Sequence, residues 1–196
     1  MPIWIANHSF TSSHTTSRIL SLIESGPYYF SLSRTNRWGR SVIGGGMLTP
    51  PPAPLPSDTL IPDEVLVYKK AYEVLGAFRN PCGLKGLPSG PNGEDEKWTL
   101  IHSSDVLLND DGTYTPDLTH LYISLLVEEG DHSAANSNIV GLHSNLQLTL
   151  DANPDGVTYP PSMVTSPGVL HWIAYTSPIE RVARLRHEVS FLLTTN

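Results

Sequence analysis

Carboxylates and an imidazole gather in one short stretch, Glu128-Glu129-Gly130-Asp131-His132. Such residue types can bind a divalent cation, but they also make an ordinary solvated turn, and we favour the turn. Asp110-Asp111-Gly112 is interpreted in the same way, because Asp-Gly is common turn chemistry. The eight histidines are scattered singly, without an HExxH motif or a His/Cys cluster. The sequence therefore predicts no metal site and no cofactor.

A second group with reactive side chains is His102, Ser103, Ser104 and Asp105. We expect this segment to be a strand, in which consecutive side chains alternate between faces, so these residues cannot form a triad among themselves. No GxSxG motif is present, and the glycines at 44–46 lack the lysine and the spacing of a phosphate-binding loop. The sequence thus predicts no catalytic residues and a protein that is not an enzyme.

The composition narrows the class of protein further. The 196 residues carry a net charge of −7 and contain no basic block, which argues against nucleic-acid binding. The single cysteine, Cys82, excludes an internal disulfide and fits a reducing compartment. No apolar run reaches the ~18 residues that could span a membrane, and the N-terminus lacks the pattern of a signal peptide. We expect a soluble protein with no membrane or nucleic-acid partner.

Short strands separated by Gly, Asn, Asp and Pro dominate the expected secondary structure. Strand patterns occur at residues 27–33, 98–108, 120–130, 139–150, 169–178 and 187–195, and loops are expected at 81–96 and 151–167. Together they predict a mainly β fold, an antiparallel β-sandwich with two short helices and long Pro/Gly-rich arms.

The two helices are expected at residues 15–25 and 62–79. The first places Ile19, Leu20 and Ile23 on one face, and the second has an apolar stripe of Val65, Tyr68, Tyr72 and Leu75. Residues 1–14 are expected to form an N-terminal arm, and residues 15–196 a single β-rich domain. Within that domain, residues 39–61 form a Pro-rich crossing, which favours the extended polyproline II conformation.

Two stretches, read together, resemble a known family. The first contains Tyr28-Tyr29-Phe30, Arg34, Trp38, Pro50 to Pro56 and Asp58-Thr59, and the second contains Gly168 to Ile173, Pro178-Ile179, Arg181 and Glu188-Val189. In this order they are similar to the baseplate wedge proteins of contractile-tailed bacteriophages, specifically the β-rich dimeric wedge subunit. Ser33 and Tyr175-Thr176 depart from the family pattern, residues 39–47 are an insertion, and residues 80–165 match poorly.

The resemblance implies a structural virion protein of the phage tail, made in the host cytoplasm and without catalytic residues. Its partners would be itself, as a dimer or higher homo-oligomer, and other tail or baseplate proteins. Aromatic, Arg and Pro residues at which we expect subunit contacts are Trp4, Tyr28, Tyr29, Arg34, Trp38, Pro50, Pro54, Pro178 and Arg181. A head-to-tail connector or a fibre-attachment adaptor would fit as well. In a different class, a carbohydrate- or metal-binding β-sandwich module stays an alternative, because the four tryptophans could stack on sugars.

Overall fold

The computed structural model describes residues 12–35, 51–55, 64–83, 85–88, 95–128, 137–179 and 187–194. Their contacts group the chain into two compact units, each made of separate stretches. The first unit draws on residues 1–26, 73–123 and 190–196, and the second on residues 27–72 and 124–189. The boundary falls within β8 (His120–Val127) and β14 (His187–Thr194). That residues 15–196 fold as one domain stays a prediction, and nearly all of the predicted arm lies outside the described residues.

The first unit contains the helix α1 (Ser12–Glu24), which is the predicted N-terminal helix, begun three residues earlier. Ile19 is fully buried, and Leu20, Ile23, Val74 and Phe78 pack against the buried cluster to which it belongs. The buried Thr16 hydroxyl joins the helix to Leu118, accepting a hydrogen bond from its backbone N–H at 2.9 Å. An apolar face and one buried polar clamp therefore fix the helix in this unit.

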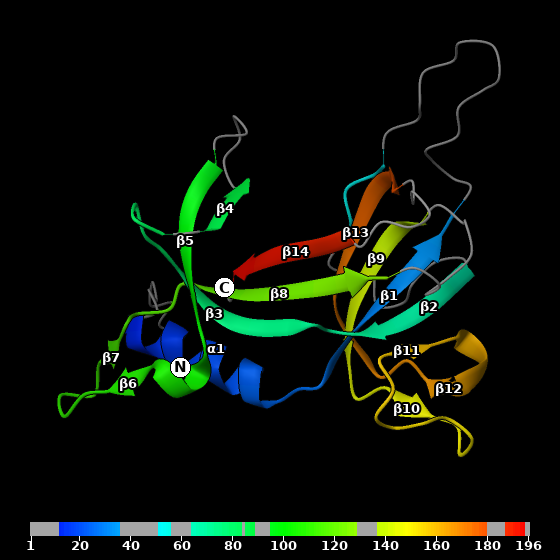
Figure 1. Ribbon diagram of the computed structural model, residues 1–196, viewed down its shortest axis with the longest axis horizontal. Helices are drawn as coiled ribbons and strands as arrows, with labels where there is room; N and C mark the ends of the chain where they lie inside the picture. Colours follow the sequence, from blue (N-terminus) through cyan, green and yellow to red (C-terminus); the bar gives the residue numbers. More distant parts are fainter. Residues whose placement is uncertain are drawn as a thin grey trace, which may run out of the picture. The chain divides into compact units, whose positions relative to one another are not determined.

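The remaining elements of the first unit are strands and one turn of 3-10 helix. They are β3 (Glu73–Arg79), β4 (Lys85–Pro88), β5 (Asp95–Ile101), η1 (Ser103–Asp105), β6 (Leu107–Leu108) and β7 (Tyr114–Thr115). A five-stranded sheet has the order β14-β8-β3-β5-β4, with β5 antiparallel to β3 and β4. The strands of this sheet can be followed in Figure 1. Trp98, Ala77 and Tyr122 form a core on it.

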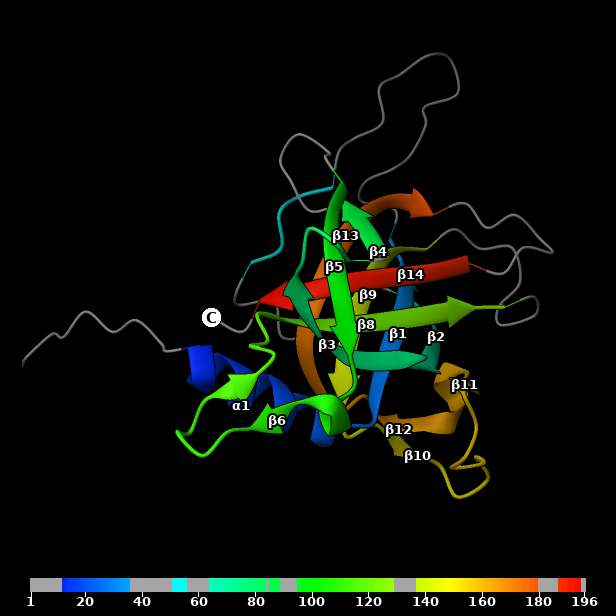
Figure 2. The same cartoon turned by 60° about the vertical axis from the view of Figure 1, so that its left-hand side comes forward.

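The second unit is built on another five-stranded sheet, of order β11-β2-β1-β9-β13. Its strands are β1 (Tyr28–Arg34), β2 (Glu64–Lys70), β9 (Ser137–Ser144), β11 (Thr158–Tyr159) and β13 (Val169–Ile179), all paired antiparallel. Two more short strands, β10 (Gln147–Leu148) and β12 (Val164–Ser166), pair with each other, and η2 (Pro161–Met163) precedes β12. These short elements gather at one end of the sheet, next to β11 and β2 (Figure 2).

The prediction of a helix at residues 62–79 is wrong. The described part of this segment forms β2 and β3, separated by a bend at Ala71-Tyr72. Glu64 to Lys70 pairs with β1, and Val65 and Val67 bring the β-branched side chains that strands favour. The described chain is mainly β with antiparallel sheets, as predicted, and it contains one α-helix instead of two.

Candidate functional site

The strand β1 carries three of the residues predicted at subunit contacts, Tyr28, Tyr29 and Arg34. It lies between β2 and β9, so both of its edges are hydrogen-bonded. Every residue from Tyr28 to Ser33 is buried, and Tyr28 and Tyr29 are 3% and 7% exposed. The chain itself covers these two rings, which leaves little of their surface for a partner.

Tyr29 belongs to an aromatic cluster that holds the end of this sheet together. Its ring meets that of Tyr159 edge-on, with 6.1 Å between ring centroids, and Tyr68 and Ala152 complete the buried group. The Tyr159 hydroxyl donates to the carbonyl oxygens of Pro154 and Gly156. Burial raises the pKa of the Tyr29 and Tyr68 hydroxyls, so both stay neutral at physiological pH. The cluster therefore anchors the segment after β10 to β1 and β2.

Two serine–histidine pairs link neighbouring strands of the same sheet. Ser31 on β1 and Nε2 of His143 on β9 are 2.9 Å apart, and Ser144 on β9 and Nε2 of His171 on β13 are 2.7 Å apart. His171 is an extra residue in the pairing of β13 with β9, since Leu170 and Trp172 face consecutive residues of β9. The Tyr28 ring meets the His171 ring edge-on. Each pair thus satisfies polar groups across a strand boundary.

His143 is the more deeply buried of the two histidines, with 2% of its surface exposed. Burial lowers its pKa from 6.5 to about 4; the Pro167 carbonyl opposes this shift, and the charge on His171 adds to it. Nδ1 has no hydrogen bond of good geometry within the described residues, although the Pro167 carbonyl is close enough to favour protonation. Burial also lowers the pKa of His171. Both rings are therefore neutral at pH 7.

The Ser31–His143 pair has the residue types of a nucleophile and its base, but its surroundings do not suit catalysis. Ser31 is fully buried, so a substrate has no access to its hydroxyl. His143 has no carboxylate among its hydrogen-bond partners in the described residues, and a ring with a pKa of about 4 is a weak base. The arrangement provides internal polar support for the sheet.

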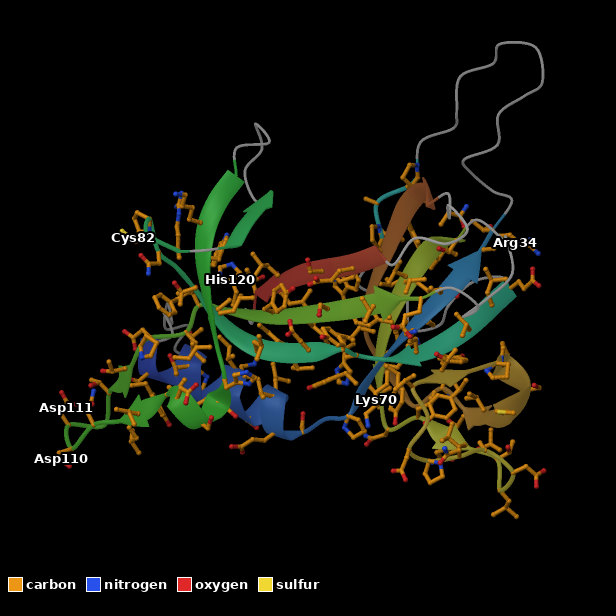
Figure 3. All side chains as sticks on the ribbon, in the orientation of Figure 1. Arg34, Lys70, Cys82, Asp110, Asp111 and His120 are labelled. Atoms are coloured by element: carbon orange, nitrogen blue, oxygen red, sulfur yellow. The ribbon has the colours of Figure 1, made fainter. Side chains whose placement is uncertain are left out.

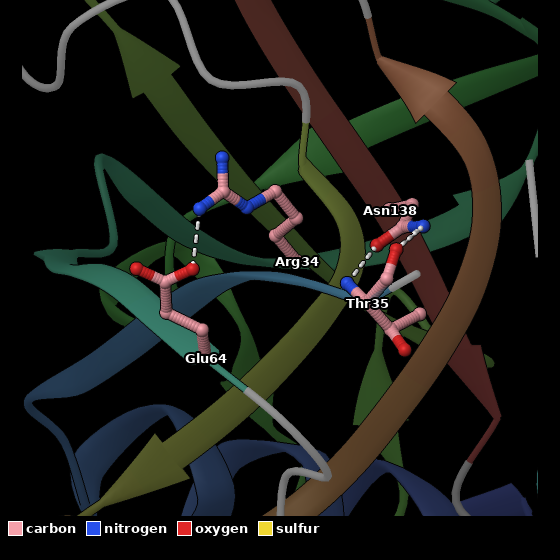
Figure 4. A network of polar contacts seen from close by, with 4 residues as sticks. All are labelled: Arg34, Thr35, Glu64 and Asn138. Atoms are coloured by element: carbon pink, nitrogen blue, oxygen red, sulfur yellow. Dashed lines mark hydrogen bonds and ion pairs between the residues drawn. The ribbon is translucent and has the colours of Figure 1, made fainter. Parts of the chain in front are cut away.

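At the far end of β1, Arg34 and Thr35 make the two contacts drawn in Figure 4. An Arg34 nitrogen lies 2.5 Å from a carboxylate oxygen of Glu64 on β2, and both side chains are half-exposed, at 43% and 59%. Thr35 is held by Asn138: its N–H donates to the Asn138 amide oxygen at 2.8 Å, and its carbonyl accepts from the amide nitrogen at 3.0 Å. This end of β1 presents an exposed ion pair above a buried amide clamp.

The structure describes only two of the other residues at which subunit contacts are predicted. Pro54 is exposed, and Pro178 lies within β13. Trp4, Trp38, Pro50 and Arg181 lie outside the described residues. Thus the structure brings Tyr28, Tyr29, Arg34 and Pro178 into one sheet and does not place the rest.

The described polar motifs that could bind a metal or supply a nucleophile form a turn and a short 3-10 helix. Asp110-Asp111-Gly112 is the turn between β6 and β7, and Gly112 has a φ of 79°, which glycine adopts without strain. Ser103 to Asp105 form η1 rather than the expected strand. Glu128 is exposed, and residues 129–132 lie outside the described part. Among described residues, no group of three His, Cys, Asp or Glu is placed to hold a metal, and no helix is long and apolar enough to span a membrane.

Several contact residues were not identified from the sequence. Glu64, Asn138 and Ser31 were missed because their partners lie 30 to 112 positions away. The sequence predicts β6 as the end of one long strand at residues 98–108 and does not predict β7. Ser103-Ser104-Asp105 is a polar interruption of the kind that indicates a break in such a strand. No protein-family model matches the chain, and a comparison with curated proteins finds no match.

Proposed function

We propose that this chain is a structural protein of a bacteriophage tail, a component of the baseplate wedge that holds neighbouring subunits in a symmetric assembly. On this proposal it is not an enzyme. Its function is to bind further copies of itself and other tail proteins, and its place is in the virion.

One observation carries the proposal. The two stretches that resemble the wedge family are separated by more than 100 residues in the chain, yet the strands with which they begin, β1 and β13, flank β9 in one sheet. The described parts of the two motifs thus belong to one sheet. This is what a shared fold would require.

The chemistry of the described side chains supports a structural role. Within the described residues, the buried Ser31 hydroxyl pairs with the His143 ring and the Thr35 backbone with the Asn138 amide, so these polar groups are bonded inside the fold. A carbohydrate-binding module receives less support. Trp98 is 3% exposed, so its ring is not available for stacking on a sugar.

Mass spectrometry of purified phage particles tests the proposal. Particles from cultures that express the chain would be separated into heads and tails, and each fraction digested and quantified. We expect the chain in the tail fraction, in a fixed ratio to other tail proteins. Presence in the infected-cell lysate together with absence from washed particles would contradict the proposal. Recovery with heads would favour the connector alternative.

A further inference from the structure

The hairpin of β6 and β7 in the first unit exposes two consecutive leucines. Leu107 and Leu108 are 63% and 64% exposed and pair with Thr115 and Tyr114 of β7. Neighbouring residues of a strand point to opposite faces, so each face of this two-stranded ribbon carries one leucine. Single exposed leucines are common on protein surfaces, but an adjacent pair on a two-stranded ribbon suits insertion into a partner.

The hairpin is fixed at its tip and at its base. At the tip, Asp111 accepts hydrogen bonds from the N–H and hydroxyl of Thr113, and the Asn109 amide donates to the hydroxyls of Thr113 and Thr115. At the base, Val106 and the buried Leu118 pack in the core around α1. A pre-organised hairpin loses little conformational entropy when it binds, so its exposed side chains can contribute most of their burial to affinity.

The charged side chains that the hairpin and its two flanks carry are all carboxylates. Figure 3 shows Asp110 and Asp111 at the tip of the hairpin. The exposed carboxylates on this hairpin and its two flanks are Asp105, Asp110, Asp111 and Asp117. Hydrogen bonds from Thr113 lower the pKa of Asp111, which keeps it charged. The sequence has no Lys or Arg between Lys97 and Arg181, so no cation of this stretch balances them. A partner that offers apolar side chains together with positive charge would therefore complement both the leucines and the carboxylates.

The chain itself contains one such segment, Arg181-Val182-Ala183-Arg184-Leu185-Arg186, in which three arginines are interleaved with apolar residues. The segment lies outside the described residues. We propose that the β6–β7 hairpin of one copy binds residues 181–186 of a second copy. The inference rests on the proposed function, which requires homo-oligomeric contacts. Hairpin and segment are different surfaces, so the contact is heterologous and can repeat from subunit to subunit until a ring closes.

The test compares self-association of the full chain with that of two complementary variants by sedimentation velocity. The hairpin variant carries Leu107→Ser and Leu108→Ser, which remove exposed apolar surface without disturbing the core. The segment variant carries Arg181→Glu and Arg184→Glu. Leu150→Ser is the matched control, because Leu150 is fully exposed in the second unit. Circular dichroism establishes that every variant is folded.

We expect each interface variant to self-associate about tenfold or more weakly than the wild type, and Leu150→Ser to behave as wild type. Mixing the two variants is the sharper measurement. The intact hairpin of one and the intact segment of the other form one contact, so the mixture should yield heterodimers that grow no further. High salt should weaken wild-type association, because the contact pairs aspartates with arginines.

Three results would overturn the inference: a wild-type chain that stays monomeric, oligomers indifferent to both variants, or a mixture without heterodimers. If the segment variant changes hydrogen exchange at the hairpin of a monomer, the segment covers its own hairpin and the second copy is excluded. These results do not test the proposal that the chain is a tail protein, which is tested by mass spectrometry of purified particles. A chain found in purified tails whose oligomers ignore the variants would refute this contact and keep the proposed function.

Discussion

Acidification between pH 6.5 and 4 should destabilise the second unit because of His143. The pKa of this buried ring falls from 6.5 to about 4 on folding, with burial as the largest cause. Above pH 6.5 the ring is neutral in both states and contributes nothing. As the pH falls, His143 binds a proton in the unfolded chain but stays neutral in the folded sheet. The free energy of unfolding therefore decreases. Below pH 4 both states are protonated and the loss is complete.

The size of the loss follows from the shift. A fall of about 2.5 units in pKa at about 1.4 kcal/mol each corresponds to a loss of about 3.5 kcal/mol once both states are protonated. The ring is surrounded by Ser31, Tyr68, His171 and the Pro167 carbonyl, and none of these groups supplies a compensating negative charge near neutral pH. His171 has a lowered pKa as well, so its titration adds loss in the same direction. An effect of this size is a large fraction of the stability of a small unit.

The measurement is urea unfolding followed by circular dichroism at several values between pH 7.5 and pH 4. Hydrogen exchange at Ser137–Ser144 would identify the transition of the second unit. The variant His143→Gln can still bond to Ser31 but cannot titrate, so its stability should depend less on pH, by about 3 kcal/mol over this range. His102→Gln, an exposed ring outside both sheets, is the control. An equal loss in wild type and His143→Gln would refute the reasoning.

Three further changes have defined outcomes in chemical denaturation. Gly168→Ala should lower the free energy of unfolding by more than about 1 kcal/mol, because Gly168 has a φ of 70° and a Cβ would collide with the backbone at the end of β9. An unchanged free energy of unfolding would contradict this. Asn138→Ala should lower the free energy of unfolding by about 1–3 kcal/mol, because the buried N–H and carbonyl of Thr35 lose their hydrogen bonds to the Asn138 amide. Asn138→Asp restores only the acceptor for the Thr35 N–H. Arg34→Ala should cost less than about 1 kcal/mol, since its pair with Glu64 is half-exposed; a larger loss would show that the pair is more than a surface contact.

The periodicity of apolar residues in the sequence predicted most of the elements whose conformation is decided by residues close to them in the chain. The strands β1, β8, β9, β13 and β14 lie where alternation placed them, and α1 lies within a few residues of its prediction. These segments combine an unambiguous period with turn residues at their ends. Asn145, with a φ of 57°, ends β9 where the sequence showed a longer strand. The end of a strand can depend on the backbone conformation of one residue, and the periodicity of the sequence does not indicate that conformation.

The failure at residues 62–79 has a physical cause. Val65, Tyr68, Tyr72 and Leu75 fit a helical face, but the same segment satisfies a strand, since its Val-Leu-Val-Tyr run is rich in β-favouring side chains. Pairing with β1 decides between the two, and pairing is a tertiary contact. The side-chain hydrogen bonds of the candidate site could not be predicted either, because Ser31 and its partner His143 are 112 positions apart in the sequence. Residue type alone does not disclose such a partner.

The position of β1 also has a consequence for how the protein is made. During translation β2 is complete once Lys70 has been added, whereas the first residue of β9 is Ser137. At about 5–20 residues per second, one edge of β1 waits roughly 3–13 seconds for its partner to be synthesised. An apolar strand with an unpaired edge is prone to pair with other chains. The nascent protein therefore passes through an interval in which chaperone binding, or slow expression at low temperature, should decide the yield of soluble product.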